Sequence, residues 1–143
     1  MVNILWSMAN EYLVKLSHLS DLIKLSRADG FVSPLETYYI DSVAEKLGVD
    51  PSDVDKLRKD ELRVRFSPPR YEYEIIPQFH RMLGLIGADR MIYSAELNLC
   101  SELCLRMGLH PSAVKEAMDK MTVYPGACLP ERVLNSIFKK YYN

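Results

Sequence analysis

The sequence predicts an all-α protein, a compact single-domain bundle of about seven helices with an internal pseudo-twofold repeat. Apolar residues recur at helical spacing along most of the chain, and Ser, Asp, Pro and Gly stand where such segments begin and end. In addition, residues 22–54 and 82–114 align without a gap at an offset of 60 residues. The length of 143 residues is that of one domain with a real hydrophobic core, so we treat residues 1–143 as one domain.

The repeat consists of identical residues and of matched apolar positions. The identical pairs are Leu25/Leu85, Ala28/Ala88, Asp29/Asp89, Glu36/Glu96, Gly48/Gly108, Pro51/Pro111, Ser52/Ser112 and Val54/Val114. Apolar positions four residues apart also recur: Leu35, Tyr39, Val43 and Leu47 are matched by Ala95, Leu99, Leu103 and Met107. Two copies are too few for a solenoid. We therefore expect the repeats, about residues 20–57 and 80–118, to form two helical units that face each other.

The first unit begins with a long helix, predicted over residues 8–29 by an apolar stripe at helical spacing. The members of this stripe are Tyr12, Leu16, Leu19 and Ile23. Ser33 followed by Pro34 and Glu36 is typical of an N-cap with a capping box, which predicts a helix over residues 34–47. Gly48 stands where that helix can end in a left-handed residue.

A third helix is predicted over residues 51–61, because Asp50 can cap it and Pro51 suits its first position. Residues 62–66 alternate between apolar and basic side chains and precede Ser67-Pro68-Pro69. This pattern indicates an extended connector without a partner strand.

The second unit repeats this order. Helices are predicted over residues 74–89, 94–107 and 111–122, and a last amphipathic helix follows over residues 130–141. Pro77 leaves the start of the first of these open, since proline is tolerated only in the first turn of a helix.

Two acidic residues flank the helix–helix turn of each unit, Asp29 and Glu36 in the first and Asp89 and Glu96 in the second. Glu36 lies four residues before Ile40, so its carboxylate is expected to lean toward the interior. Asp29 falls at the C-terminal end of a helix, where the macrodipole disfavours a negative charge. A carboxylate in this position beside another one favours a cation or a buried donor nearby. The four residues are therefore the candidate metal ligands.

The alternative is a purely structural role. Glu36 can close a capping box on Ser33, and Asp29 can serve as a turn residue. In the second unit Tyr93 replaces the Ser cap, yet Glu96 remains, so capping alone does not account for Glu96. Both interpretations stay open at the level of sequence.

A helix that ends in Ala-Asp-Gly, a next helix that opens with Val-Ser-x-x-Glu, and a Leu-Gly stop together resemble the TerB-like tellurite-resistance family. The match covers about residues 20–57 and again 80–118. The resemblance implies an all-helical fold with pseudo-symmetry and acidic residues that bind divalent cations, which in this chain are Asp29, Glu36, Asp89 and Glu96. Similar domains occur in a DnaJ-like membrane-anchored co-chaperone, which implies a stress-response or chaperone-related setting.

The chain departs from the family pattern at Arg90, where the first copy has Gly30, and in an unusually short spacer between the units. A glycine takes a positive φ at no steric cost, whereas an arginine is penalised there. We expect the guanidinium of Arg90 to pair with Asp89 or Glu96 and to stand where a cation stands in relatives.

Other candidate sites are weaker. Cys100 and Cys104 have the spacing of a metal-ligand pair, but Ile40 and Ala44 occupy the equivalent positions, which predicts that both cysteines belong to the core. The sequence contains no H-E-x-x-H motif, Gly-rich phosphate loop or G-x-S-x-G elbow. We therefore expect no enzymatic activity, and a metal-dependent hydrolase is the lowest-ranked alternative.

Charge and composition exclude further classes. The chain has 18 basic and 19 acidic residues, and its basic residues near the connector are interleaved with acidic ones, so no nucleic-acid partner is expected. No apolar run approaches the roughly 20 residues that span a bilayer, and the N-terminus lacks the basic region of a signal peptide. Three cysteines cannot all pair internally, which fits a reducing compartment such as the cytoplasm.

These observations predict a non-enzymatic bacterial stress-response protein of the cytoplasm, similar to TerB. It is expected to bind other proteins and, through the paired acidic residues, a divalent cation; no other cofactor is expected. The alternative is a pure protein-interaction module, similar to a co-chaperone, that binds no metal.

Overall fold

A computed structural model describes the whole chain except residues 1, 90, 125, 127, 142 and 143 and the side chains of residues 2 and 3. The described part contains seven helices and no strand, which confirms the all-α fold. The helices are α1 (Val2–Ser26), α2 (Pro34–Leu47), α3 (Pro51–Arg58), α4 (Glu72–Ile86), α5 (Ser94–Met107), α6 (Pro111–Met121) and α7 (Glu131–Tyr141).

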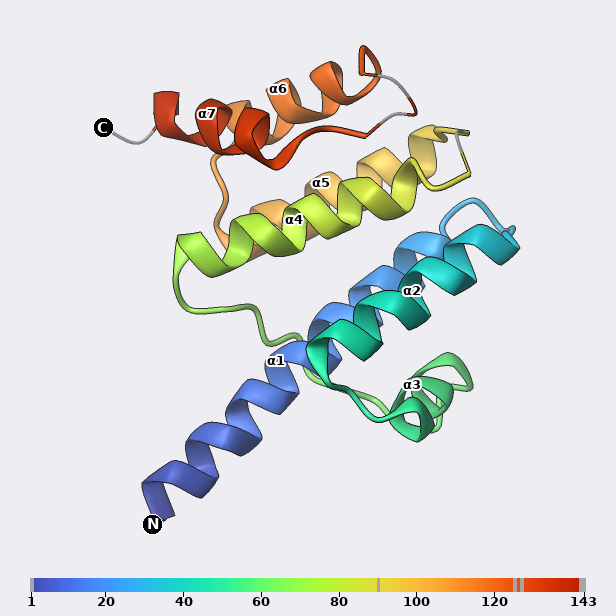
Figure 1. Cartoon of the computed structure of the whole chain (residues 1–143), viewed down its shortest axis with the longest axis vertical. Helices are drawn as coiled ribbons and strands as arrows, with labels where there is room; N and C mark the ends of the chain where they lie inside the picture. The colour runs from blue at the N-terminus through green and yellow to red at the C-terminus, as the bar shows by residue number, and fades with distance from the viewer. Residues whose placement is uncertain (1, 90, 125, 127, 142–143) are drawn as a thin grey trace.

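The helices lie in layers (Figure 1). The pair α1–α2 packs against the pair α4–α5, α6 and α7 cover the far side of α4 and α5, and α3 packs against α1 and α2. Helix α1 is the central element, because it contacts α2, α3, α4 and α5. Between α4 and α7, the rings of Phe79 and Phe138 pack edge to face with centroids 6.0 Å apart. A single cluster of buried apolar residues, with members from all seven helices, joins both units.

The local signals of the repeat recur in the structure at the same offset. Helices α1 and α4 end at Ser26 and Ile86, and α2 and α5 have the same length. Gly48 and Gly108 both end their helices in the left-handed conformation, with φ of 73° and 93°. Asp50 and His110 then cap the next helix through their side chains. Equivalent sequence signals thus produce equivalent helix ends.

Three helices differ from their predicted bounds by more than one residue, and the first of them, α1, already begins at Val2 rather than at residue 8. α1 ends at Ser26 rather than at residue 29, because the chain tightens into a turn in which the Ala28 amide donates to the Leu25 carbonyl. α3 ends at Arg58 rather than at residue 61, since Asp60 has a positive φ of 58°. α4 spans residues 72–86 rather than 74–89 and contains Pro77 in its second turn.

The connector between the units is extended, as predicted, and forms no strand. It crosses α1 and α5, where the Ser67 amide donates a 2.8 Å hydrogen bond to Ser17 Oγ and the Arg106 guanidinium lies 4.1 Å from the centre of the Phe66 ring. These contacts tie the connector to one helix of each unit. None of the described helices combines the length and the apolar character needed to cross a membrane.

Candidate functional site

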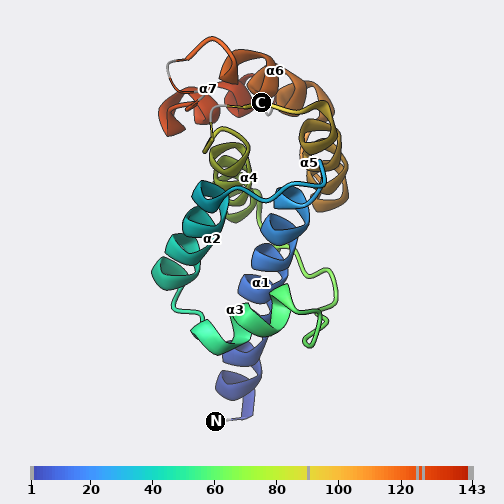
Figure 2. The same cartoon turned by 90° about the vertical axis from the view of Figure 1, so that its right-hand side faces the viewer.

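The four predicted acidic residues come from the two helix–helix turns, which lie at the same end of the molecule (Figures 1 and 2). Asp29 and Asp89 lie in the turns themselves, and Glu36 and Glu96 are the third residues of α2 and α5. The pKa values of Glu36 and Glu96 both respond to carboxylates of the opposite unit. The structure therefore brings all four together, and we call them the acidic cluster.

The two aspartates make the same local bond. Asp29 Oδ1 accepts a 3.1 Å hydrogen bond from the Phe31 amide, and Asp89 Oδ1 accepts a 3.0 Å bond from the Met91 amide. Such bonds, from an amide two residues on, are typical of a carboxylate that closes a turn. Both aspartates are half-buried. In each of them, one carboxylate oxygen is used in the hydrogen bond that closes the turn.

Glu36 is only 1% exposed and forms the predicted capping box. Its Oε1 accepts a bond from the Ser33 amide, and its own amide donates to Ser33 Oγ, both at 3.1 Å. Its second oxygen, Oε2, is buried and has no hydrogen-bond partner among the residues that the structure describes. Leaving a buried carboxylate oxygen unpaired costs free energy, on the order of 1–3 kcal/mol or more for a charged group. Within the described ranges, Oε2 of Glu36 is thus a buried acceptor without a donor.

Glu96 is only 2% exposed, but its environment differs from that of Glu36. The N-cap of α5 is Tyr93, which makes no side-chain capping bond. The Glu96 carboxyl instead lies within hydrogen-bonding reach of Asp29 in the other unit. Burial, followed by the carboxylates of Glu36, Asp29 and Asp89, raises the pKa of Glu96 to about 8.

The difference between the two glutamates follows from the caps. Burial also raises the pKa of Glu36, but the hydrogen bonds from Ser33 stabilise its ionised form and oppose that rise. Glu96 has no such donors among the described residues, so burial and neighbouring charge raise its pKa without opposition from a cap. At neutral pH, Glu96 therefore holds a proton.

The donor set consists of carboxylate oxygens, which suit hard divalent cations such as Mg²⁺, Ca²⁺ or Mn²⁺ rather than Zn²⁺ or Cu⁺. In the described part of the chain, however, no three His, Cys, Asp or Glu side chains are arranged so that they could hold one metal ion. The four carboxylates lie close enough to shift the pKa of Glu96 strongly. Their oxygens would have to move closer to one another to coordinate a cation. Arg90, the predicted internal partner of Asp89 or Glu96, lies outside the described residues.

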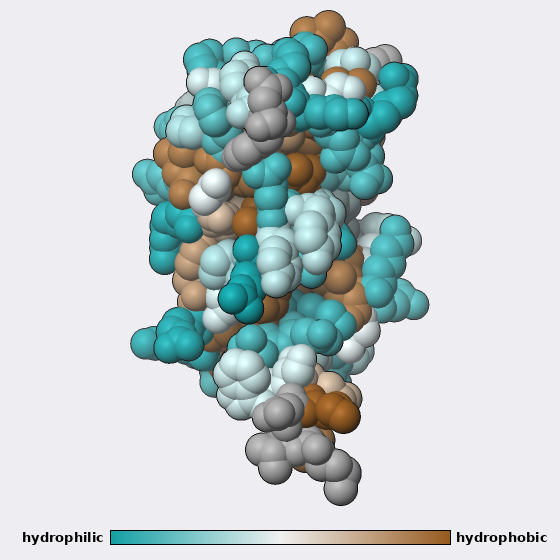
Figure 3. Space-filling model, turned by 90° about the vertical axis from the view of Figure 1, so that its left-hand side faces the viewer, coloured by the Kyte–Doolittle hydropathy of each residue, from teal (hydrophilic) through white to brown (hydrophobic). Residues whose placement is uncertain are grey.

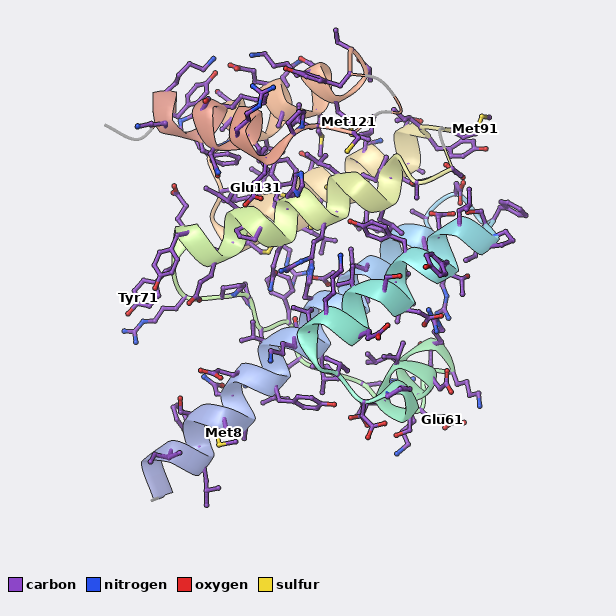
Figure 4. The ribbon with its side chains drawn as sticks, viewed as in Figure 1. Met8, Glu61, Tyr71, Met91, Met121 and Glu131 are labelled. Carbon is purple, nitrogen blue, oxygen red and sulfur yellow. The ribbon has the colours of Figure 1, made fainter. Side chains whose placement is uncertain are left out.

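Exposed apolar side chains lie on the same two turns and on α2, a feature that the sequence reasoning missed. Phe31 and Met91 are exposed at equivalent positions of the two turns, and Met91 lies at the tip of its turn (Figure 4). Leu35 and Tyr38 are exposed nearby on α2 and line a cavity of about 440 Å³ between α2 and α4. The signal was present in the repeat, because Phe31 and Met91 are apolar at the same turn position.

The remaining candidates lie elsewhere. Cys100 and Cys104 are fully buried, as predicted, and belong to the core. Two buried polar residues of α1 were not anticipated: His18, whose two ring nitrogens have no hydrogen-bond partner in the described part of the chain, and Asp21, whose pKa burial raises to about 6. Neither belongs to the acidic cluster.

No protein-family model matches the chain, and the curated proteins and solved structures offer no match to it either.

Proposed function

We propose that the chain is a TerB-like, non-enzymatic protein that binds a hard divalent cation between its two helical units through Asp29, Glu36, Asp89 and Glu96. The proposal includes a bacterial stress-response setting in the cytoplasm and binding of other proteins. The observation that carries it is Oε2 of Glu36, which is buried inside a group of four carboxylates and has no donor in the described part of the chain. A cation would offset both the missing donor and the mutual repulsion of the carboxylates.

The four carboxylates have enough oxygens to bind a cation while they keep the hydrogen bonds that close the two turns. One oxygen each of Asp29, Asp89 and Glu36 is used in a local bond, which leaves Oδ2 of both aspartates and Oε2 of Glu36 for a ligand. Glu96 would contribute its carboxylate after releasing its proton, because a ligating carboxylate must be ionised. Cation binding is therefore expected to strengthen as the pH rises toward 8.

A second candidate is the protein-interaction module without metal. It is favoured by the capping bonds of the acidic residues and by the exposed apolar side chains of Phe31, Leu35, Tyr38 and Met91 beside the cluster. In this case the proton of Glu96, rather than a cation, reduces the repulsion between the carboxylates. The apolar side chains would contact a partner protein in either case.

Thermal unfolding in the presence of Mg²⁺, Ca²⁺ or Mn²⁺ separates the two candidates. Ligand binding to the folded state alone stabilises it by about 2.7 kcal/mol at a free concentration of 100 Kd. We expect the wild type to gain stability with added cation at pH 8, and the Glu36→Gln/Glu96→Gln variant to remain folded but to lose this gain.

The matched control is Glu45→Gln/Glu102→Gln, which removes two exposed carboxylates from the same helices and should keep the full response. If the wild type shows no cation-dependent shift at millimolar concentration, the interaction module is the better account. An equal response in both double variants would place the cation elsewhere.

A further inference from the structure

A groove with a volume of about 550 Å³ lies between α1 and α4, and the end of α2 and the connector form its edges. None of its lining residues belongs to the acidic cluster. The start of α4 lies at the left of Figure 1, and Figure 3 shows that side of the molecule face on, with hydrophilic and apolar side chains interleaved. The volume suits a small organic ligand, since ligand pockets span roughly 300–1,000 Å³.

Two stripes of side chains line this groove, and each has the spacing of one helical face, because residues three, four and seven apart lie on the same side of a helix. The stripes consist of Glu11, Val14 and Lys15 on α1 and of Glu74, Pro77, Gln78 and Arg81 on α4. Each stripe begins with an exposed glutamate and ends with half-buried or buried polar residues. The groove therefore has an exposed acidic end and an inner end that carries Lys15, Gln78 and Arg81.

The inner end has two positive charges without counter-ions among the described residues. Lys15 and Arg81 are half-buried, and neither side chain forms a salt bridge or a hydrogen bond in the described part of the chain. Burial lowers the pKa of Arg81, and the charges of Tyr39 and Glu131 oppose only part of this effect. The guanidinium has thus lost water without gaining a carboxylate.

Two further polar side chains at this end are unpaired. Gln78 is only 7% exposed and lines the groove, yet its side-chain amide makes no hydrogen bond to a described residue. His18 continues the stripe of α1, three residues after Lys15, and both of its buried ring nitrogens lack a partner within the described ranges. The charge of Arg81 contributes to the lowered pKa of His18, so the ring lies within electrostatic range of the guanidinium. Because most buried polar groups in proteins are hydrogen-bonded, such a group of unpaired ones favours a ligand.

The two glutamates do not neutralise the inner end. Glu11 and Glu74 are exposed, where water and salt screen their charge. Glu11 precedes Lys15 by four residues but forms no salt bridge with it. A charge acts more strongly where water is excluded, so the half-buried cations determine the sign of the potential at the inner end.

Apolar side chains from four segments complete the lining. They are Val14 of α1, Leu47 of α2, Pro69 of the connector and Tyr73 of α4. Pro69 is buried, whereas the Tyr73 ring is 70% exposed at the edge of the groove. A mainly apolar wall with a few polar groups at one end is typical of sites for small organic molecules.

We propose that this groove binds a small organic anion, with its oxyanion between Lys15 and Arg81 and its apolar body against Leu47, Pro69 and Tyr73. A guanidinium can donate two parallel hydrogen bonds to a carboxylate or a phosphate, and the Gln78 amide adds a further donor. Carboxylates and phosphate monoesters share this chemistry. The inference is independent of the cation proposal, because it uses none of the four acidic residues.

Calorimetric titration of the full chain with phenylacetate and with phenyl phosphate, without divalent cations, tests the proposal. We expect one or both anions to bind at least about tenfold more tightly than phenylacetamide, which has the same ring without the charge. Inorganic phosphate, which lacks the apolar body, should also bind at least about tenfold more weakly than phenyl phosphate. The tighter of the two organic anions identifies the preferred head group.

Arg81→Gln should weaken binding of the organic anion by at least about tenfold, as expected for the loss of a charge-assisted hydrogen bond. The variant keeps the backbone carbonyl that accepts the hydrogen bond of Tyr39, so we expect it to fold. Lys15→Gln removes the other cation from a different helix and should weaken binding as well. The matched control is Arg63→Gln, which removes the same charge at an exposed position outside the groove and should leave the affinity unchanged.

Circular dichroism checks the fold of each variant, and Lys15→Gln decides if Arg81→Gln does not fold. In NMR spectra of the wild type, the side-chain amide signals of Gln78 should shift as the organic anion is added.

Three results would overturn the proposal. The first is that neither organic anion binds more tightly than phenylacetamide. The second is that inorganic phosphate binds as tightly as phenyl phosphate, which would indicate an adventitious ion only. The third is an equal loss of affinity in Arg81→Gln and Arg63→Gln, which would make the binding a general effect of net charge.

Discussion

The carboxyl group of Glu96 lies within hydrogen-bonding reach of Asp29, so the two helical units meet at their turns through a pair of acids. Two carboxyl groups share a hydrogen bond only when one of them holds a proton, and the pKa of about 8 assigns this proton to Glu96 at neutral pH. The contact between the units thus depends on protonation, and a cation would compete with the proton for the same site.

The stability of the protein is expected to fall as the pH rises from about 5 to 8. The pKa of Glu96 is raised from 4.5 to about 8 on folding, so the folded state binds the proton more tightly than the unfolded state in this window. Each unit of such a shift corresponds to about 1.4 kcal/mol. We compare the thermal unfolding of wild type and Glu96→Gln at pH 6.5 and 8.5 without divalent cations. The variant should lose less stability than the wild type between these two pH values.

Asp21→Asn serves as the control for this pH dependence. The pKa of Asp21 is raised only to about 6, so that residue titrates mainly below the tested window. Asp21→Asn should therefore keep the loss between pH 6.5 and 8.5. A variant Glu96→Gln with the same loss as the wild type would refute the assignment.

Replacing Tyr93 by serine should create in the second unit the capping box that Ser33 and Glu36 form in the first. Tyr93 has the extended backbone of an N-cap, with φ of −106° and ψ of 141°, but makes no side-chain capping bond. An added cap is worth about 1 kcal/mol, and hydrogen bonds from the introduced serine would lower the pKa of Glu96. We expect Tyr93→Ser to raise the free energy of unfolding and to weaken its pH dependence above pH 6.5. Ser33→Ala, which removes the cap of α2, should have the opposite effect on stability.

His18 should limit stability at acidic pH. Burial, with a further contribution from the charge of Arg81, lowers its pKa from 6.5 to about 3, so the unfolded chain binds a proton that the folded chain excludes. Stability contributed by the neutral ring is lost as the pH falls from 6.5 toward 3, by up to about 1.4 kcal/mol per pH unit. His18→Leu fills a similar volume and should flatten this loss in urea unfolding between pH 6.5 and 4.5. Parallel pH profiles of variant and wild type would contradict the prediction.

Gly84→Ala should destabilise the contact between α2 and α4. A Cβ at Gly84 would overlap the hydroxyl of Tyr39, which donates a 3.0 Å hydrogen bond to the Arg81 carbonyl. Overpacking of this kind costs about 1–3 kcal/mol, which exceeds the gain of about 1 kcal/mol from replacing glycine within a helix. Urea unfolding should therefore give a lower free energy of unfolding.

The double variant Tyr39→Phe/Gly84→Ala tests the cause. Removing the hydroxyl relieves the closest overlap, so the cost of Gly84→Ala should be smaller in the Tyr39→Phe background. Additive effects of the two changes would show that the hydroxyl is not the obstacle.

Arg90→Gly should raise the affinity of the chain for divalent cations. The change restores the residue of the first copy, where Gly30 has a φ of 83°, and removes a positive charge beside Asp89. Calorimetric titration with Mg²⁺ or Ca²⁺ should show tighter binding than in the wild type. Unchanged affinity would mean that the Arg90 guanidinium does not occupy the place of the cation.

The sequence by itself determined the helices and most of their ends. Ser33 with Glu36, Gly48 with Gly108, and Asp50 before Pro51 are signals that act within four residues, so they operate in the same way in any fold that contains them. The burial of Glu36 followed from its spacing to Ile40 on one helical face. Local interactions with a fixed helical period can be predicted from a single chain.

Only the tertiary structure decided the properties of the candidate site. The pKa of Glu96 depends on three carboxylates, two of which come from the other unit, and the capping boxes alone could not predict how closely the turns approach. The partner of Tyr39, the isolation of His18 and the projection of α1 beyond Tyr12 likewise depend on where distant segments pack. Electrostatic energies and burial depend on distances in space, and the packing of one unit against the other sets those distances.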